Sequence, residues 1–425
     1  MSMMVLDRAL RRFVKHGTVT VRDAEGKTHR QGTPEPGWPD LVVVLNDRKV
    51  GGFIARHPRL GLGEAWMDGR ISIEGGDIMD FVSFMRRNNP WETTGSFAPP
   101  GLLARTADKL ASSFDQLNQR LASRRNVAHH YDLGDPLYDL FLDANRQYSC
   151  AYWEDGVTSL EEAQVAKMNH LAAKLALRPG MRVLDIGCGW GGLALHLNRV
   201  AGVKVHGVTL STEQFAYARQ WARREGVESE VTFGLTDYRD AQGPFDRIVS
   251  VGMFEHVGRP NFETFFGACR DLLADDGIAL IHTIGRVGPP GVTDAFTRKY
   301  IFPGGYIPAM SETVAASEKA HLMLTDAEVL RVHYGKTIRE WYRRCAARRD
   351  RIVELYDERF YRMWMFYLAG AATVFEDGGM VNFQLQYARR RDTLPLTRNY
   401  IHDGEVAYSA AGGHGANVVP IGLGR

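Results

Sequence analysis

The chain has 425 residues, of which 44% are hydrophobic and 24% are charged, and its formal net charge is +2. This length exceeds the usual size of one hydrophobic core, so we predict two domains in a soluble globular protein. The near balance of charge excludes a general attraction to nucleic acid. The 4 cysteines lie far apart without a C-x-x-C pair. We therefore expect no disulfide framework and no metal site, as is usual in a reducing cytoplasm.

The amino-terminal part of the chain is predicted to be a small α+β domain over residues 1–100. Its first residues lack the continuous apolar stretch of a secretory signal, and no window of the sequence is apolar enough to span a bilayer. We expect a strand at residues 41–45 and a helical pattern after the glycine-rich stretch that follows. Residues 88–101 contain Pro and Gly and predict a break, and a polar helical linker is expected over residues 101–128.

Strands and helices alternate from about residue 180 onward. MRVLDIGCG (residues 181–189) is typical of a strand that runs into a glycine turn, and further strands are expected at VKVHGVTL, EVTFGL, DRIVSVGM and IALIHTIG. This alternation indicates βαβ units and predicts a parallel sheet with helices on both faces, the α/β class. We place this second domain at residues 129–398 and expect a flexible tail at residues 399–425, which are small, polar and rich in Gly.

The most specific local pattern is the glycine turn after the first of these strands. It reads D-x-G-x-G-x-G from Asp185 to Gly191, with the acidic residue inside the strand end. Glycines let the backbone approach a ligand closely, and open α/β sheets bind ligands at the carboxyl ends of their strands. The pattern resembles the class I methyltransferases, a Rossmann-like fold in which this turn admits the amino-acid part of S-adenosylmethionine. The alternative is a purely structural turn.

Residues from the next strands are expected at the same edge of the sheet. The second strand ends at Thr209 and Leu210, and Gln214 lies one turn into the following helix. Thr209 stands where many relatives of this fold carry an acidic partner for the ribose. Asp237 and Tyr238 follow the third strand, where they are placed to flank the adenine. An exposed turn is the competing interpretation of that pair.

Three further residues fall at places that this fold directs toward a reacting methyl group. Glu255 follows the fourth strand, His282 lies at the end of the fifth, and Cys150 lies upstream of the first. Each has an ordinary alternative, because a lone cysteine is usually a small buried apolar group, a histidine near a strand end is often structural, and a carboxylate can cap a helix.

Motifs spread over the chain resemble those of the cyclopropane-fatty-acid synthases and the mycolic acid cyclopropane synthases. They are YDL, YSCAYW, VLDIGCGWGG, FEHVG and HYGKTIREWY, in the order and spacing of that family, and they extend from about residue 129 to residue 391. GLGEAWMDG also looks like part of the amino-terminal domain of the longer bacterial members. The resemblance implies a class I methyltransferase domain with a mostly parallel seven-stranded sheet, preceded by a lipid-binding or dimerisation domain.

The resemblance also implies an activity, which is methylene transfer from S-adenosylmethionine to a cis double bond in the acyl chains of membrane phospholipids. Methyl transfer leaves a carbocation, and removal of a proton from the new methyl group closes a cyclopropane ring. In the family the base is a bound bicarbonate ion. Its expected ligands in this chain are Cys150, Glu255, His282 and Tyr334, with backbone groups near Gly252 and Ile284.

A second set of residues is implied around the cofactor. Tyr131 and Tyr148 are expected to help enclose the sulfonium, because an aromatic face suits a cation. A bicarbonate ion beside Glu255 would make the ionised carboxylate costly, which predicts a raised pKa for Glu255. The other expected contacts of S-adenosylmethionine are Ser149, Asp185, Gly187, Gly189, Thr209, Leu210, Gln214, Asp237 and Tyr238.

The acyl substrate predicts contact with a membrane surface, and we expect a cytoplasmic protein on the inner face of the cytoplasmic membrane. Residues 339–351 cluster arginines around Trp341 and Tyr342, which suits anionic headgroups. A solvated helix face with acidic partners such as Glu340 is equally favoured. The apolar stretch 363–375 is expected to be a core or acyl-pocket helix. A homodimer is left open.

Three alternatives compete with this interpretation. The first is a fatty-acid C-methyltransferase with methyl-branched or methylene products, and the joint presence of the four anion ligands argues against it. The second is a small-molecule N- or O-methyltransferase, which would leave those ligands and the amino-terminal domain unexplained. The third is a lipid-binding protein without activity, which the intact cofactor and catalytic motifs disfavour.

Overall fold

The structure is a computed structural model of the chain, and it describes residues 10–94, apart from residue 12, and residues 134–413. The molecule divides into two compact units, and neither of them is one continuous stretch of sequence. Unit 1 comprises residues 1–106, 294–303 and 335–379, and unit 2 comprises residues 107–293, 304–334 and 380–425.

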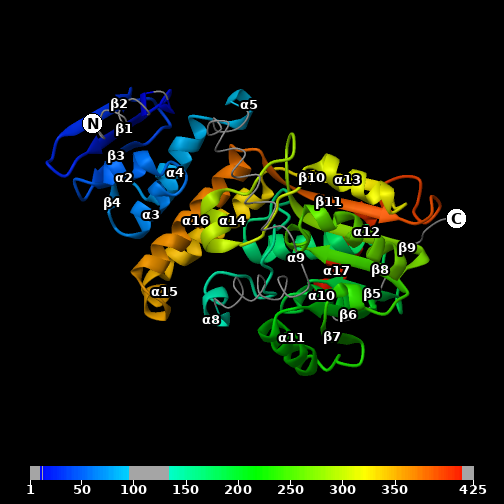
Figure 1. Cartoon of the computed structure of the whole chain (residues 1–425). Helices are drawn as coiled ribbons and strands as arrows, with labels where there is room; N and C mark the ends of the chain where they lie inside the picture. The colour runs from blue at the N-terminus through cyan, green and yellow to red at the C-terminus, as the bar shows by residue number, and fades with distance from the viewer. Residues whose placement is uncertain (1–9, 12, 95–133, 414–425) are drawn as a thin grey trace. The chain divides into compact units, whose positions relative to one another are not determined.

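Unit 1 contains a four-stranded sheet in the order β2-β1-β3-β4 (Figure 1). β1 pairs antiparallel with β2 and parallel with β3, and β3 pairs antiparallel with β4. The strand predicted at residues 41–45 is β3, in which Leu41, Val43 and Leu45 are buried at alternate positions, as the period of a strand requires. The strands are β1 Thr18–Arg22, β2 Thr28–Gly32, β3 Asp40–Leu45 and β4 Ile71–Glu74.

The helices of unit 1 come from distant parts of the sequence. α16, which contains the apolar stretch predicted to be a helix, packs on α3 and α4. The indole Nε1 of Trp66 donates to the backbone oxygen of Arg362 at 2.9 Å, and Arg362 Nε donates to the backbone oxygen of Trp66 at 2.5 Å. The helices are α2 Val50–Arg56, α3 Gly61–Met67, α4 Ile78–Arg87, α5 Trp91–Thr94, α14 His333–Ala347 from its third residue, α15 Arg349–Leu355 and α16 Glu358–Glu376, with a π-helical turn at Thr297–Ile301.

These units differ from the contiguous domains that the sequence suggested. Residues 335–379 were expected in the catalytic domain, but they belong to the unit that contains the amino-terminal domain. The expected break at residues 88–101 begins with a well-anchored residue, since the buried Asn88 side chain accepts hydrogen bonds from the backbone N–H groups of Lys15 and His16, both at 2.7 Å. The predicted linker at residues 101–128 lies outside the described residues.

Unit 2 contains a seven-stranded sheet in the order β10-β11-β9-β8-β5-β6-β7. The strands from β9 to β7 in this order pair in parallel, and β11 pairs antiparallel with both β9 and β10. This confirms the predicted α/β class with a mostly parallel sheet. The strands are β5 Arg182–Ile186, β6 Lys204–Thr209, β7 Val231–Leu235, β8 Phe245–Val251, β9 Leu273–Arg286, β10 Met323–Leu330 and β11 Met380–Ala388.

Helices cover both faces of this sheet (Figure 1), as the βαβ alternation predicted. One buried cluster combines the sheet with α9, α10 and α17, and the other combines it with α12 and α13. The helices of unit 2 are α8 Asp135–Tyr138, α9 Leu160–Lys174, α10 Gly192–Ala201, α11 Thr212–Arg224, α12 Phe262–Leu272, α13 Met310–Lys319 and α17 Asn399–Gly413.

The prediction of a flexible tail from residue 399 is wrong for residues 399–413, which form α17. α17 packs on α9 and α10. Its Tyr400, Ile401 and Tyr408 are all less than a tenth exposed and belong to the core cluster of one sheet face. The Gly-rich composition of the segment concealed these three apolar positions, and their burial stabilises the helix more than the glycines weaken it.

Candidate active site

The glycine turn lies between β5 and α10, where the pattern predicted it. Gly187 and Gly189 have positive φ angles of +81° and +55°. A Cβ atom on Gly187 would lie 2.8 Å from the Met253 side chain, whereas a Cβ atom on Gly189 would meet no atom within 4 Å. Gly189 therefore borders open space at the carboxyl end of β5, which is the place where a ligand of such a sheet binds.

Asp185 lies just before this turn and is 1% exposed. Its Oδ2 atom is buried and has no hydrogen-bond partner among the described residues. Burial raises the pKa of Asp185 to about 7, although the Lys167 ammonium lowers it. A buried carboxyl oxygen without a partner is costly, so it indicates a position that a ligand completes.

The structure brings Thr209 and Gln214 together at the end of β6. Thr209 Oγ1 donates to Gln214 Oε1 at 3.2 Å and accepts a hydrogen bond from the backbone N–H of Ser211, also at 3.2 Å. Leu210 lies between them in the chain, immediately after β6. A hydroxyl and an amide thus lie at the strand end next to the glycine turn.

Asp237 and Tyr238, after β7, are both engaged with protein groups. Both carboxylate oxygens of Asp237 bond to the Arg239 guanidinium, at 2.7 Å and 2.6 Å. The Tyr238 ring lies edge-on to Phe265, with 5.4 Å between the ring centroids, and burial raises the pKa of its hydroxyl. These contacts fit a structural turn as well as they fit a wall of the cofactor site.

The segment from Asn145 to Cys150 crosses the start of α10. A Cβ atom on Gly192 would lie 2.1 Å from the backbone oxygen of Asn145, and one on Gly252 would lie 4.0 Å from Ser149 Cβ. The segment therefore runs beside both the glycine turn and the loop after β8. Cys150 is fully buried, and burial raises the pKa of its thiol, so the thiol stays protonated.

Tyr148 packs within an aromatic group in this region. Its ring lies edge-on to Tyr138 at 5.3 Å and to Phe141 at 6.0 Å between ring centroids. Tyr131, the other tyrosine expected at the sulfonium, lies outside the described residues. Ser149 Oγ accepts a hydrogen bond from Lys167 Nζ at 3.0 Å.

Two hydrogen bonds join the loop that contains Gly252 and Glu255 to the end of β9, which contains His282 and Ile284. Glu255 lies in the 3-10 turn Phe254–His256 after β8, and its Oε1 accepts a hydrogen bond from the Ile284 N–H at 2.6 Å. Gly252 N–H donates to the backbone oxygen of His282 at 2.9 Å. These bonds join the loop after β8 to the end of β9 and bring together four of the residues that the sequence assigned to an anion site.

Burial shifts the pKa values of the ionisable groups of this cluster toward their neutral forms. Burial raises the pKa of Glu255 to about 7, and its Oε2 atom is buried without a hydrogen-bond partner in the described part of the chain. Burial also lowers the pKa of His282 well below its usual range. The two ring nitrogens of His282 lie 3.1 Å from Asn382 Nδ2 and 3.2 Å from Gln384 Nε2, amides of β11 that fix the ring plane.

Tyr334 is 8% exposed and lies at the start of α14. Its neighbour His333 accepts a hydrogen bond at Nδ1 from the Trp153 N–H at 2.9 Å, and its ring stacks on that of Tyr152 at 5.2 Å. Tyr152 and Trp153 follow Cys150 by two and three residues, so these contacts connect the Cys150 and Tyr334 segments.

Sequence reasoning missed four buried polar side chains in this region, namely those of Gln164, Lys167, Asn382 and Gln384. Each is at most 1% exposed. Gln164 and Lys167 lie one turn apart on α9, and Asn382 and Gln384 lie two residues apart on β11. Polar residues that repeat at helical or strand spacing among apolar neighbours are the signal that would have identified them.

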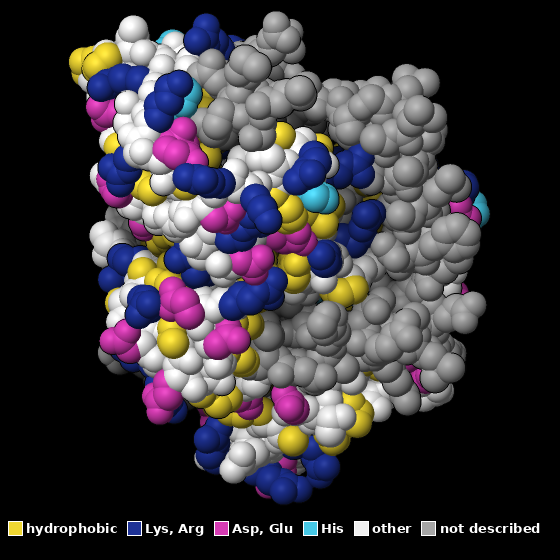
Figure 2. All heavy atoms as spheres, turned by 60° about the vertical axis from the view of Figure 1, so that its left-hand side comes forward, with side chains coloured by type: hydrophobic (Ala, Val, Ile, Leu, Met, Phe, Trp, Pro, Cys, Tyr) yellow, Lys and Arg dark blue, Asp and Glu magenta, His cyan; other side chains and the backbone are white. Residues whose placement is uncertain are grey.

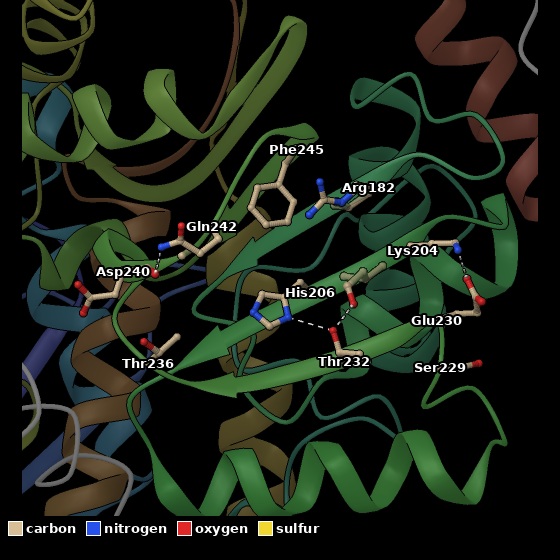
Figure 3. Close-up of a pocket in the computed structure, with 13 residues that line it drawn as sticks. Arg182, Lys204, His206, Ser229, Glu230, Thr232, Thr236, Asp240, Gln242 and Phe245 are labelled. Atoms are coloured by element: carbon tan, nitrogen blue, oxygen red, sulfur yellow. Dashed lines mark hydrogen bonds and ion pairs between the residues drawn. The ribbon is translucent and has the colours of Figure 1, made fainter.

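A hollow of about 420 Å³ lies in unit 2 near the amino ends of β5, β6 and β8 (Figure 3). Several of its polar side chains bond to one another or to the backbone. His206 Nδ1 lies 2.9 Å from Thr232 Oγ1, and Lys204 pairs with Glu230 at 3.7 Å. Parallel sheets bind ligands at the opposite, carboxyl ends of their strands, so we do not assign the active site to this hollow.

The arginine-rich segment predicted to contact headgroups is paired with acidic residues in its own neighbourhood. Arg339 pairs with Glu376, and Arg343 and Arg344 both pair with Glu340. Figure 2 shows basic and acidic side chains interspersed on the face turned toward the viewer. These pairs favour the solvated helix face over a patch that carries charges of a single sign.

No group of three or more metal-ligating side chains occurs in the described ranges.

The chain is similar in sequence and in structure to several known proteins. Residues 118–385 match a family model described as "Mycolic acid cyclopropane synthetase". The cyclopropane-fatty-acyl-phospholipid synthase of Escherichia coli (strain K12) is 40% identical over 330 residues, which are 78% of this chain and 83% of that protein. The tuberculostearic acid methyltransferase UfaA1 of Mycobacterium tuberculosis is 32% identical over 410 residues, 90% of each chain. The crystal structure of mycolic acid cyclopropane synthase CmaA1 complexed with SAH and CTAB has a TM-score of 0.60 at 34% identity and covers 62% of this chain and 97% of its own.

Proposed function

Because the chain belongs to the mycolic acid cyclopropane synthetase family, we propose that it is a cyclopropane-fatty-acyl-phospholipid synthase. It transfers the methylene unit of S-adenosylmethionine to the cis double bond of an unsaturated acyl chain in a membrane phospholipid. The observation that carries the proposal is the 40% identity to the Escherichia coli synthase over 78% of this chain. The buried groups at the carboxyl ends of β5, β8 and β9 are consistent with it.

S-adenosylmethionine supplies the electrophilic methyl group in this proposal. The residues around the glycine turn fit it on two observations. Gly189 borders open space at positive φ, and the Oδ2 atom of Asp185 has no partner among the described residues. Asp185 would accept a hydrogen bond from the amino group of the cofactor, and Thr209 with Gln214 would bind its ribose hydroxyls.

A bicarbonate ion, when bound, supplies the base for the second step. The surrounding groups fit an anion because burial shifts the pKa of Glu255, Cys150 and His282 toward the neutral form of each group. The raised pKa of Cys150 keeps its thiol protonated and the lowered pKa of His282 keeps its ring neutral, whereas Glu255, with a pKa of about 7, is protonated in a large fraction of the molecules at neutral pH. Protonated Glu255 can donate a hydrogen bond from Oε2, the atom that has no partner in the described residues.

The chain itself must exclude water from this chemistry. The π electrons of the alkene form the bond to the methyl carbon while the carbon–sulfur bond breaks and leaves neutral S-adenosylhomocysteine. A proton then leaves the added methyl group, and its bonding pair closes the ring. The intervening carbocation would react with water, so the site must be dry. Glu255 and His282, 8% and 1% exposed, lie in such surroundings.

One observation favours a second candidate function, a fatty-acid C-methyltransferase. The tuberculostearic acid methyltransferase UfaA1 matches along 90% of both chains, at 32% identity. A methyl-branched alkene would form if the cation lost a proton from a neighbouring carbon of the chain, and a methylene product if a hydride shift preceded loss of a proton from the added methyl group. The higher identity of the Escherichia coli synthase favours ring closure.

Location and assembly are further parts of the proposal. A phospholipid substrate lies in a bilayer, so we expect peripheral contact with the inner face of the cytoplasmic membrane, and the amino-terminal domain is proposed to bind lipid or form a homodimer. The paired arginines of α14 and α15 give this contact little support. In the described ranges, every helix is too short or too polar to cross a membrane.

The proposal is tested by incubating the protein with vesicles of cis-unsaturated phospholipid and S-adenosylmethionine that carries a trideuterated methyl group. The released fatty acids are analysed by mass spectrometry before and after mild hydrogenation. Ring closure predicts a product that keeps two of the three deuterons and resists hydrogenation. A product that keeps all three, or takes up hydrogen as an alkene, would establish the C-methyltransferase instead. Absence of label in lipid would refute both.

A further inference from the structure

α9 presents a row of polar side chains to the interior of unit 2, which is unusual for a helix that belongs to a hydrophobic core. Gln164, Lys167 and Lys174 are 0% exposed and His170 is 3% exposed. A lysine is almost never fully buried unless it is paired. The two buried lysines therefore need partners, and the partners differ at the two ends of the helix.

The first half of this row holds the segment that crosses the start of α10. Gln164 Nε2 donates to the backbone oxygens of Gln147 and Ser149 at 3.2 Å and 3.0 Å. Lys167 Nζ donates to Gln147 Oε1 at 2.5 Å and to Ser149 Oγ at 3.0 Å. Four hydrogen bonds from one helix thus set the positions of Gln147 and Ser149, the second of which directly precedes Cys150.

Lys167 also supplies a positive charge that acts on two buried carboxyl groups, those of Asp143 and Asp185. The ammonium interacts electrostatically with both of them. Asp143 accepts hydrogen bonds from the backbone N–H groups of Asn145 and Gln147, both at 2.8 Å, and these bonds favour its ionised form. Asp185 has an oxygen without a partner among the described residues. If the positive charge were absent, Asp185 would be the group to take up a proton.

We propose that Lys167 is a positioning residue for the amino-acid end of S-adenosylmethionine, which it serves by anchoring Ser149 and by favouring the ionised form of Asp185. The inference rests on the proposed co-substrate. An ionised Asp185 can bind the ammonium of the ligand's amino-acid part, whereas a protonated one cannot attract it. The adenosine part would be bound elsewhere, at the end of β6, and does not depend on Lys167.

The affinities for two ligands distinguish a role of Lys167 at the amino-acid end of the co-substrate from a general role in folding. S-adenosylhomocysteine contains the adenosine, the sulfur and the amino-acid part, whereas 5′-methylthioadenosine lacks the amino-acid part. The two affinities are measured by isothermal titration calorimetry on the full chain. Lys167→Met should lower the affinity for S-adenosylhomocysteine about 10- to 100-fold and leave that for 5′-methylthioadenosine within about threefold of wild type.

Lys174→Met is the matched control, because Lys174 is equally buried on the same helix but pairs with Glu328 and Asp326 instead. It should change the two affinities by the same factor. Lys167→Gln keeps a donor near Ser149 and serves if the methionine variant does not fold. It should still lose affinity selectively, because it also lacks the charge.

Several results would overturn the inference. They are an equal loss of both affinities in the Lys167 variants, wild-type affinities in Lys167→Gln, or the same selective loss in Lys174→Met. A wild-type chain that binds neither ligand would instead overturn the proposed co-substrate, and with it every role assigned to Lys167. Failure of lipid modification alone would leave the binding result intact.

Discussion

The two ends of the sheet in unit 2 differ in how their polar side chains are bonded. At the carboxyl ends of the strands, Asp185 and Glu255 each have a buried oxygen without a hydrogen-bond partner in the described residues. Burial raises the pKa of both carboxyl groups to about 7. At the amino ends, around the hollow of Figure 3, Lys204 pairs with Glu230 and Gln242 bonds to a backbone oxygen.

This difference shows that the presence of a cavity is a weaker sign of a site than the state of its polar groups. The hollow has volume, but several of its polar side chains already bond to one another or to the backbone. The carboxyl end carries buried groups that remain costly until a ligand binds. Function is therefore expected where folding leaves polar groups unsatisfied, and the following variants test that expectation.

The largest expected effect is on the rate of the reaction when Glu255 is changed. Glu255→Gln preserves the shape of the side chain but removes a titratable group from the anion cluster. We expect the initial rate of lipid modification to fall about 100-fold, because the carboxylic O–H that donates to the bound anion is replaced by a less acidic amide N–H, and one positioned donor contributes a factor of this order. The rate is measured with labelled S-adenosylmethionine and phospholipid vesicles.

Glu230→Gln, in the hollow, is the matched control for this variant and should leave the rate unchanged. If Glu255→Gln retains a rate within about threefold of wild type, Glu255 does not take part in the reaction. If Glu230→Gln is the slower enzyme, the hollow contains the site and the comparison is reversed.

The second largest expected effect is on the free energy of unfolding of Glu255→Gln relative to wild type, and this difference depends on pH. The pKa of Glu255 is about 7 in the folded chain against 4.5 for an ordinary glutamate. The folded state therefore binds more protons between these values, and the stability of the wild type falls as pH rises through this window. Glu255→Gln removes that loss. Its free energy of unfolding relative to wild type should be greater at pH 8 than at pH 5 by about 2 kcal/mol.

The measurement is urea denaturation of both proteins at the two pH values. A relative stability that does not change with pH would show that Glu255 is ionised in the folded protein at neutral pH. In that case the cluster could not receive an anion as proposed.

The smallest expected effect is on the free energy of unfolding when Glu230, which lines the hollow, is changed. Lys204 and Glu230 are 58% and 43% exposed, and exposed ion pairs contribute little. Glu230→Gln should change the free energy of unfolding by less than about 0.5 kcal/mol, without a pH dependence like that of Glu255→Gln. A loss several times larger, seen in the same urea titrations, would mean that this pair is more than a surface contact.

The parts of the fold that could be predicted are those where local sequence and tertiary structure agree. VLDIG forms a buried strand because its apolar residues and its terminal glycine suit both the strand and the turn, and FEHVG and IHTIG lie at strand ends for the same reason. Glu255 and His282 could therefore be placed together, and the structure joins their segments through the Ile284 and Gly252 hydrogen bonds.

Other features depend on packing between distant residues and could not be predicted from local patterns. Nothing near α16 in the sequence shows that it packs on α4 rather than on the sheet of unit 2. α17 was mistaken for a tail because its composition outweighed Tyr400 and Tyr408. Lys167 was overlooked because a lysine on a helix is usually exposed, and only the fold shows it is fully buried.

The central claim is that the ligand site lies at the carboxyl ends of the strands, and the most direct test compares S-adenosylhomocysteine binding in two variants by isothermal titration calorimetry. Asp185→Asn changes the carboxyl end, and Thr232→Val changes the hollow at the amino ends. The account predicts that Asp185→Asn weakens binding about 10- to 100-fold and that Thr232→Val binds as the wild type does. Wild-type affinity in Asp185→Asn together with a loss in Thr232→Val would contradict it.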